Sequence, residues 1–417
     1  MNKKIGNIFK GDKVVWMVFF FLCMISIVEV FSASSHLTYK SQNYMGPIIY
    51  HVGTIVAGVV IAIITLNIPC RYFKIMTPFL LLASFFTLIW VLIGGDNING
   101  ANRVISLPGF TFQPSEIAKG TIVLITAQIL SAMQREDGAD QQAFKYILWI
   151  ALPMIALIGI ENLSTAILIS FVVLLMMFIG RVPLQQLGKL LGIVAAIAAF
   201  AFAVIMLVGN VEDKDPKLTK VERTEPQAEK KDGNFIEKGL QKMFHRADTW
   251  KGRIVKFTDS KEIAPEDFDL DKDAQVAHAN IAIVSSNVIG RGPGNSVERD
   301  FLPQAFSDFI YAIIVEEMGI TGAAFVALLY IILLFRAARI ANRCENNFPA
   351  LLVMGIALLL VVQATFNMMV AVGLAPVTGQ PLPLISKGGT STIINCAYIG
   401  AILSISRSAK RKQVITE

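Results

Sequence analysis

The 417-residue chain has few charged residues and few cysteines for its length. Charged side chains make up 16% of the sequence, and the four cysteines, at positions 23, 70, 344 and 396, form no CxxC pair. None of the four lies in the large polar segment 211–300, so the spacing indicates neither a disulfide framework nor a structural zinc site. So little charge over so long a chain also argues against a soluble multidomain protein.

The charges that are present are slightly unbalanced. Lys and Arg total 37 against 31 Asp and Glu, a net charge of +6. In a chain this apolar, a basic excess mostly reports which loops face the cytoplasm. We therefore expect no nucleic-acid partner.

Long apolar runs are what the sequence has in abundance. Hydrophobic residues make up 54% of the chain, and the mean hydropathy is +0.59, which is typical of an integral membrane protein. Lys10 and Lys13 precede the first run, and no convincing small-residue cleavage site follows it. We interpret that run as a first span rather than a removed signal peptide.

Most of these runs have the ~20 residues that a helix needs to cross a bilayer. The stretch between Lys145 and Arg181 contains only one charge, Glu161, and as a single helix would be roughly 50 Å long. Because cations flank both of its ends, we divide it into two spans with a turn at Glu161-Asn162. The predicted fold is an all-α polytopic membrane protein of about ten transmembrane helices, at 14–33, 47–68, 75–93, 114–133, two within 145–181, 187–208, 308–335, 348–372 and a last one ending before 407.

Cation clusters fall on alternate loops of this arrangement, which places both termini in the cytoplasm. We predict one membrane domain over 1–417, with 211–300 as a large external loop inserted between spans 7 and 8. Within that loop, 232–257 suggests a basic amphipathic helix and 273–289 an apolar helix. No internal repeat argues for an inverted-repeat transporter.

Three acidic residues lie at or near membrane depth beyond the large loop. Asp308 falls where span 8 begins, and Glu316 and Glu317 lie about two turns, ~12 Å, deeper. A carboxylate at that depth is costly and is a functional-site hypothesis by default. The alternative for Asp308 is an ordinary acid at a helix N-terminus.

A second polar group precedes span 4. Pro114 suits the first position of a helix, and Glu116 suits its first turn. Lys119 follows three residues later, so a simple Glu116–Lys119 ion pair is an alternative to a functional role. Arg103 lies shortly before, on the same predicted external side.

A third polar group lies between spans 9 and 10, where Thr-Gly-Gln-Pro-Leu-Pro-Leu-Ile-Ser-Lys-Gly-Gly-Thr-Ser occupies 378–391. Irregular backbone near membrane depth is tolerated where it lines a cavity or is buried in protein. This loop places Ser386 and the cation Lys387 at the predicted external face. Gly-Arg-Gly-Pro-Gly at 290–294 lacks the Gly-Lys-Ser/Thr ending of a P-loop and predicts a turn.

Taken in order, these motifs resemble the SEDS family, which includes the division protein FtsW and the elongation protein RodA. The resemblance extends over about 300 residues and ten spans. Its motifs are Gly-Ala-Asn-Arg and Phe-Gln-Pro-Ser-Glu-Ile-Ala-Lys at 100–119, Gly-Arg-Gly-Pro-Gly-Asn-Ser, Leu-Pro, Ser-Asp-Phe-Ile and Glu-Glu-Met-Gly at 290–319, and the 378–391 segment. Three positions depart from the family pattern: Asn162 replaces an Asp, Gln304 a Glu and Lys387 a Tyr.

The resemblance implies a peptidoglycan glycosyltransferase that polymerises lipid II at the outer face of the cytoplasmic membrane. The family's essential Asp falls on Asp308, and its Glu and Lys fall on Glu116 and Lys119. Lipid II carries an α-linked sugar diphosphate and the polymer is β-linked, so the anomeric centre inverts. Such a displacement needs a general base and charge stabilisation for the leaving diphosphate. Asp308 suits the base, and Arg103, Lys119 and Lys387 are the candidate cations, with Ser386 beside Lys387.

The sequence requires no cofactor, but a divalent cation, Mg or Mn, could accompany the diphosphate. The expected partners are lipid II, a class B penicillin-binding protein that cross-links the glycan, and other membrane proteins of the divisome. The Glu161–Thr165 variant favours a division role at the septum over a RodA-type role. A lipid II flippase, for which Glu316 and Glu317 are the motivation, and a non-enzymatic division scaffold are the alternatives.

Overall fold

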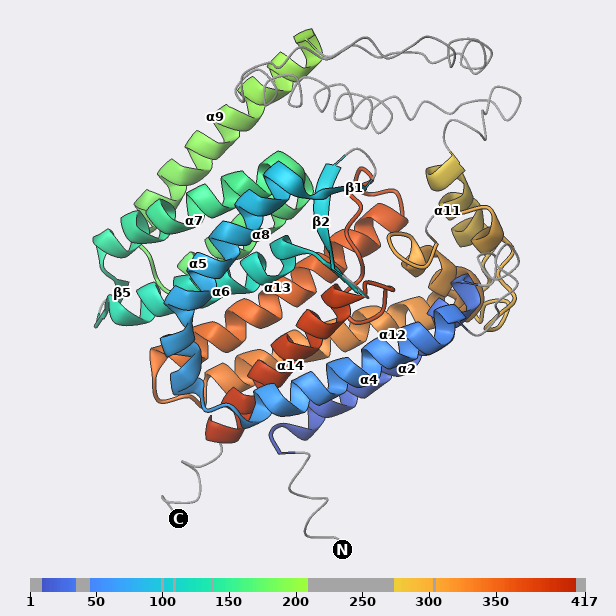
Figure 1. Cartoon of the computed structure of the whole chain (residues 1–417), viewed down its shortest axis with the longest axis horizontal. Coiled ribbons are helices and arrows are strands. Elements are labelled where there is room, and N and C mark those ends of the chain that lie inside the picture. Colours follow the sequence, from blue (N-terminus) through green and yellow to red (C-terminus); the bar gives the residue numbers. More distant parts are fainter. Residues whose placement is uncertain are drawn as a thin grey trace, which may run out of the picture. The chain divides into compact units, whose positions relative to one another are not determined.

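The computed structural model describes residues 10–34, 46–98, 101–107, 110–136, 138–208, 274–302 and 305–409. The predicted all-α polytopic fold is confirmed, and long helices occupy the ten predicted spans (Figure 1). These helices are α2 (Lys13–Ala33), α4 (Gly46–Asn67), α5 (Cys70–Gly94), α6 (Pro114–Ala132), α7 (Gln141–Glu161), α8 (Leu163–Ile179), α9 (Leu184–Val208), α12 (Ile310–Ala341), α13 (Asn347–Ala371) and α14 (Thr390–Ala409).

Six of the described helices, α2, α4, α5, α7, α12 and α13, are long and apolar enough to cross a membrane. The predicted turn between α7 and α8 is also present. Asn162 connects the two helices, and its Oδ1 accepts a hydrogen bond from the backbone N–H of Thr165 at 3.1 Å. An Asn side chain at this position satisfies one of the free N–H groups of the new helix, which is why the long apolar stretch divides here.

The chain forms two compact units, residues 1–187 with 269–417, and residues 188–268. In the second unit the structure describes the continuation of α9 as far as Val208. The amphipathic helix predicted at 232–257 lies outside the described residues. That residues 211–300 form a single inserted loop stays a prediction, because the structure describes only the end of this segment, from residue 274.

That end begins with α11 (Ala274–Val284), which ends five residues before the end of the helix predicted at 273–289. The hydroxyls of Ser285 and Ser286 donate to the carbonyls of Ala282 and Ile283 at 3.2 and 2.6 Å. Serine hydroxyls that bond to nearby carbonyls compete with the next helical turn. The helix therefore ends before the apolar pattern does, and a 3-10 turn, η2 (Glu298–Asp300), follows.

Short strands occupy the loops beside α6, where the sequence indicated only a polar, glycine-containing break. β1 (Asp96–Ile98), β2 (Ala101–Leu107) and β3 (Phe110–Phe112) form an antiparallel sheet in that order. β4 (Gln134–Arg135) and β5 (Gly138–Ala139) form a two-stranded ladder between α6 and α7. Strands this short carry too few residues for a period of two to stand out.

Within the first unit, α13 lies at the centre of the helix packing. It packs against α12, α6 and α8, while α14 packs against α4, and α12 against α2 (Figure 1). Outward-facing apolar side chains such as Phe79, Trp149 and Ile93, each about 70–80% exposed, are typical of a lipid-facing surface.

One end of this unit gathers three segments that the charge pattern assigned to the same side. Arg336, near the end of α12, pairs with Asp12 at the start of α2 at 2.8 Å. The hydroxyl of Ser406, near the end of α14, accepts from the N–H of Asp12 at 2.9 Å. Burial raises the pKa of Asp12, but hydrogen bonds from Arg336 and two backbone amides, with the Arg336 charge, bring it below the usual 3.8.

Near its N-terminal end, α12 is broken at Gly319, whose φ of 70° is left-handed. The turn that begins at Gly290, with φ of 82°, lies directly against this break. A Cβ on Gly290 would lie less than 3.0 Å from the backbone of Glu317, and one on Gly319 equally close to Val288. Glycine is required at both positions because the two backbones touch. The 290–294 motif is thus a turn, as predicted.

Candidate functional site

Asp308 lies in a turn, residues 305–309, that leads into α12, and its side chain is half-buried. The hydroxyl of Ser307 donates to its Oδ1 at 3.0 Å. Its backbone carbonyl accepts from Asn367 Nδ2 of α13 at 2.8 Å. Asp308 is therefore partly exposed as a residue, and its backbone is held from the central helix.

The loop between α13 and α14 runs alongside this turn and brings Ser386 and Lys387 to it. Ser386 Oγ donates to the Ser307 carbonyl at 2.6 Å, and the N–H of Lys387 donates to the Phe306 carbonyl at 3.0 Å. Asp308 thus directly follows Phe306 and Ser307, the two residues to which the loop is bonded. The structure brings together three of the residues that the sequence singled out: Asp308, Ser386 and Lys387.

The cationic group of Lys387 lies over the ring of Phe306, 5.1 Å from its centroid. Among the residues that the structure describes, no carboxylate pairs with it. Burial lowers the pKa of Lys387 below its ordinary value of 10.5. A partly exposed ammonium that pairs with no carboxylate among the described residues is suited to receive an anion.

Lys119 has a different environment. It is fully buried, and its Nζ lies 2.8 Å from Glu116 Oε1 and 2.8 Å from Gln363 Oε1. Glu116 is 2% exposed, so the two charges neutralise each other inside the protein. The Glu116–Lys119 ion pair expected from the three-residue spacing is therefore present, and the Glu116 carboxylate compensates the charge of Lys119. Arg103 lies in β2, and its side chain is outside the described residues.

The loop that carries Lys387 is bonded to several helices along its length. Gln380 Nε2 donates to Thr165 Oγ1 of α8 at 2.8 Å, and Ser26 Oγ of α2 donates to the Ile385 carbonyl at 2.6 Å. Tyr330 of α12 donates to the Pro383 carbonyl. Irregular backbone inside a helix bundle must find such partners because its own amides and carbonyls are not paired in a helix or sheet.

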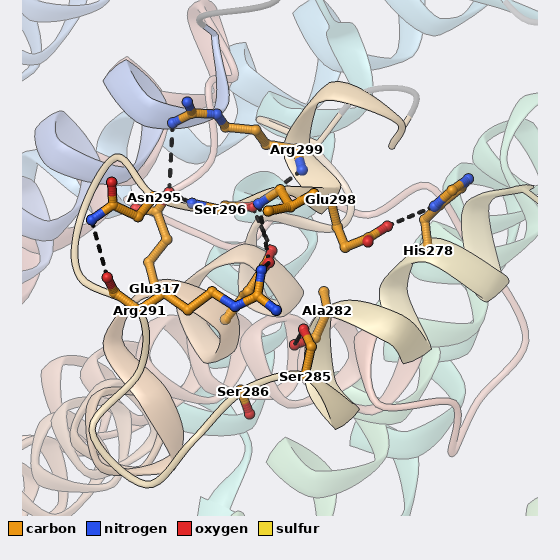
Figure 2. Close-up of polar contacts among 12 residues, drawn as sticks. His278, Ala282, Ser285, Ser286, Arg291, Asn295, Ser296, Glu298, Arg299 and Glu317 are labelled. Carbon is orange, nitrogen blue, oxygen red and sulfur yellow. Dashed lines mark hydrogen bonds and ion pairs between the residues drawn. The ribbon is translucent and has the colours of Figure 1, made fainter.

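Glu316 and Glu317 have a structural task in this arrangement. Glu316 accepts from Ser296 Oγ at 2.5 Å and pairs with Arg291 at 3.1 Å. Glu317 accepts from the backbone N–H groups of Gly294 and Ser296 at 2.9 and 3.2 Å. Figure 2 shows the 291–299 segment passing over Glu317, with Arg299 nearby. Both acids thus fix the turn onto the break in α12.

Near the beginning of α6 lies a small cavity of about 20 Å³. It is lined by Leu88 and Val91 of α5, by the first residues of α6, and by the end of α7 with Glu161 and Asn162. Asn162, where the family pattern has an Asp, caps α8, so the side chain there has a helix-forming role.

The sequence analysis did not single out Gln363 and Asn367, two amides of α13 that bond to the 378–391 loop, to Lys119 and to the backbone of Asp308. The signal was available, because two amide side chains four residues apart interrupt the apolar run 348–372. For a metal, no group of three or more His, Cys, Asp or Glu side chains with ligand geometry occurs among the described residues. The divalent cation therefore stays a prediction.

Comparison with known proteins shows the family of this chain. A sequence profile of the FtsW, RodA and SpoVE family, described as cell cycle proteins, matches residues 12–228 and 239–411. The chain belongs to this family. The family assignment covers the segments that carry Asp308, the Glu116–Lys119 pair and the 378–391 loop.

Similar proteins include a probable peptidoglycan glycosyltransferase FtsW from Halomonas elongata, 29% identical over 94% of this chain and 90% of the relative. The peptidoglycan glycosyltransferase MrdB of Escherichia coli K12 is 26% identical over 94% of this chain and 93% of its own.

Two solved structures show the same fold. A chain from a peptidoglycan synthase complex superposes with a TM-score of 0.69, 23% identity, and coverage of 96% of this chain and 98% of that one. RodA of Thermus thermophilus superposes with a TM-score of 0.61 and 22% sequence identity, and the match covers 96% of this chain and 98% of that one.

Proposed function

We propose that this protein is a peptidoglycan glycosyltransferase that polymerises lipid II, with Asp308 as the general base. The observation that carries the proposal is the half-buried Asp308 carboxylate beside a loop whose cation, Lys387, has no carboxylate partner in the described residues. The names of the relatives support the reaction class. Support for the membrane setting comes from the six long apolar helices.

In the proposed reaction the Asp308 carboxylate takes the proton of the acceptor hydroxyl as that oxygen attacks the anomeric carbon of the donor. The new C–O bond forms on the face opposite the diphosphate, whose C–O bond breaks, so the configuration inverts. The Ser307 hydroxyl, 3.0 Å from Asp308 Oδ1, orients the carboxylate. The Lys387 ammonium balances charge on the departing diphosphate.

Glu116 and Lys119 support this site through the protein rather than by direct contact, because both are buried and paired. A Mg or Mn ion, if it takes part, would draw most of its ligands from the diphosphate and water, as Mg commonly does. A class B penicillin-binding protein is the proposed cross-linking partner, and other divisome membrane proteins would complete the assembly.

The test is gel analysis of glycan chains made from lipid II by purified protein, with and without the partner and divalent metal. Asp308→Asn should abolish polymer while the protein stays folded and monodisperse. Asp300→Asn is the matched control, since Asp300 precedes the site on an exposed turn. Polymer formation by Asp308→Asn at the wild-type rate would refute the base assignment.

The flippase alternative has lost its motivating observation, because Glu316 and Glu317 accept hydrogen bonds from the turn above them. Dye-labelled lipid II in liposomes separates the two activities: quenching of both leaflets without polymer would favour transport. We further propose a division role, for which a fluorescent fusion should collect at the septum. A fusion found only along the side wall would instead indicate a RodA-type role.

A further inference from the structure

Two buried amides on α13 lie between the proposed base and the loop that carries Lys387. Gln363 and Asn367 are each 1% exposed and are four residues apart, so they project from the same face of the helix. Neither takes part in the reaction steps proposed above. We call them the amide pair.

Asn367 connects two segments that are distant in the sequence. Its Nδ2 donates to the carbonyl of Asp308 at 2.8 Å and to the carbonyl of Gln380 at 2.7 Å. A single amide nitrogen, with two protons, is therefore shared between the backbone of the base and the backbone of the loop. Loss of this amide would release both backbones from their shared anchor.

Gln363 holds the next residue of the same loop. Its Nε2 donates to the Pro381 carbonyl at 3.0 Å, and its Oε1 accepts from Lys119 Nζ at 2.8 Å. The amide pair thus binds two successive carbonyls, those of Gln380 and Pro381. The buried Lys119–Glu116 pair in turn fixes the orientation of the Gln363 amide, because an ammonium can bond only to its oxygen.

The loop needs such anchors because of its composition. Pro381 and Pro383 have no N–H to donate, and neither lies in a helix or strand. The Pro383 carbonyl accepts a buried hydrogen bond and the Pro381 carbonyl a partly buried one, and both find their donors outside the loop. Side chains on α13 and α12 supply those donors, so the shape of the loop is set by tertiary contacts.

We propose that Gln363 and Asn367 are positioning residues for the reaction, which hold Asp308 at a fixed spacing from Ser386 and Lys387. This inference rests on the proposed function. In the mechanism above, the base and the diphosphate cation act on opposite sides of the same anomeric carbon. Their spacing therefore decides the rate of the chemical step, and a misplacement of ~1 Å can cost on the order of 100-fold.

The decisive experiment compares Asn367→Leu, Asn367→Asp and Gln363→Glu with wild type in the purified lipid II polymerisation assay. Leu keeps a similar volume but donates nothing. Gln363→Glu keeps the acceptor for Lys119 and loses the donor to Pro381. We expect kcat to fall on the order of 100-fold for Asn367→Leu and less for Gln363→Glu, with KM changed by no more than about threefold.

Asn367→Asp gives a readout that a purely structural role would not change. Only the protonated acid can donate to a carbonyl, so its activity relative to wild type should fall as the pH rises. Thr365→Val is the matched control, because Thr365 is exposed on the same helix and, among the described residues, its hydroxyl donates only to the Val361 carbonyl one turn earlier. It should retain wild-type activity.

Wild-type kcat in all three variants, or a pH-independent ratio for Asn367→Asp with unchanged KM, would overturn the positioning role. If Asn367→Leu fails to fold, the other two variants, which preserve side-chain volume, decide the question. Failure of the proposed function is distinguishable: then wild type makes no polymer, or Asp308→Asn makes as much as wild type, and the positioning role falls with it.

Discussion

The buried Glu116–Lys119 pair allows a quantitative prediction. The two charged atoms are 2.8 Å apart, and the side chains are 3% and 1% exposed. At an effective dielectric constant of about 20, their attraction is ~6 kcal/mol, much of which offsets the cost of removing both charges from solvent. Glu116→Gln leaves the Lys119 charge buried without its carboxylate. The expected loss is about 3–5 kcal/mol.

That loss converts into a measurable shift in thermal unfolding. With ~2.1 cal/mol/K of unfolding entropy per residue over 417 residues, 3–5 kcal/mol corresponds to about 3–6 °C in midpoint. Lys119→Met should produce a shift of similar size. The double variant Glu116→Gln/Lys119→Met removes both charges, so its midpoint should lie above that of either single variant.

The assay is thermal unfolding of the four proteins in one detergent, with Arg135→Met as the control. Arg135 pairs with Asp140 at the surface and is 75% exposed, so its loss should change the midpoint little. A double variant whose shift equals the sum of the single shifts would show that the two side chains do not interact. The buried pair would then not be the reason that Lys119 is unavailable to substrate.

Two further predictions follow from the loop and the turn. Burial lowers the pKa of Lys387 below 10.5, so the rate of polymerisation should decline at a lower pH than the one at which a free lysine loses its proton. Lys387→Arg should shift that decline to higher pH. An unchanged pH profile in Lys387→Arg would exclude the Lys387 charge from the reaction. Gly290→Ala should lower the thermal midpoint more than Gly294→Ala. Both glycines have a left-handed φ, so an alanine at either position costs roughly 1–2 kcal/mol. Only at Gly290 would the added Cβ also meet the backbone of Glu317. Equal shifts would contradict the close approach.

The sequence by itself determined the helical fold and the order of its spans. Apolar runs of helical length, broken by charged or glycine-rich loops, leave few alternatives in a membrane. Alternating cation clusters placed the start of α2 and the ends of α12 and α14 on one side, and the Asp12–Arg336 pair and the Asp12–Ser406 bond bring those ends together. The sequence also selected Asp308, Ser386 and Lys387.

Only the tertiary structure decided which candidates share a site and which serve the fold. Lys119 and Lys387 look alike as cations on one predicted face. Glu116 compensates the buried charge of Lys119, whereas the ammonium of Lys387 lies over the ring of Phe306. Glu316 and Glu317 look like free acids until the turn at 290–296 is placed on them. Such differences depend on contacts between residues far apart in the chain, which local periodicity and composition do not encode.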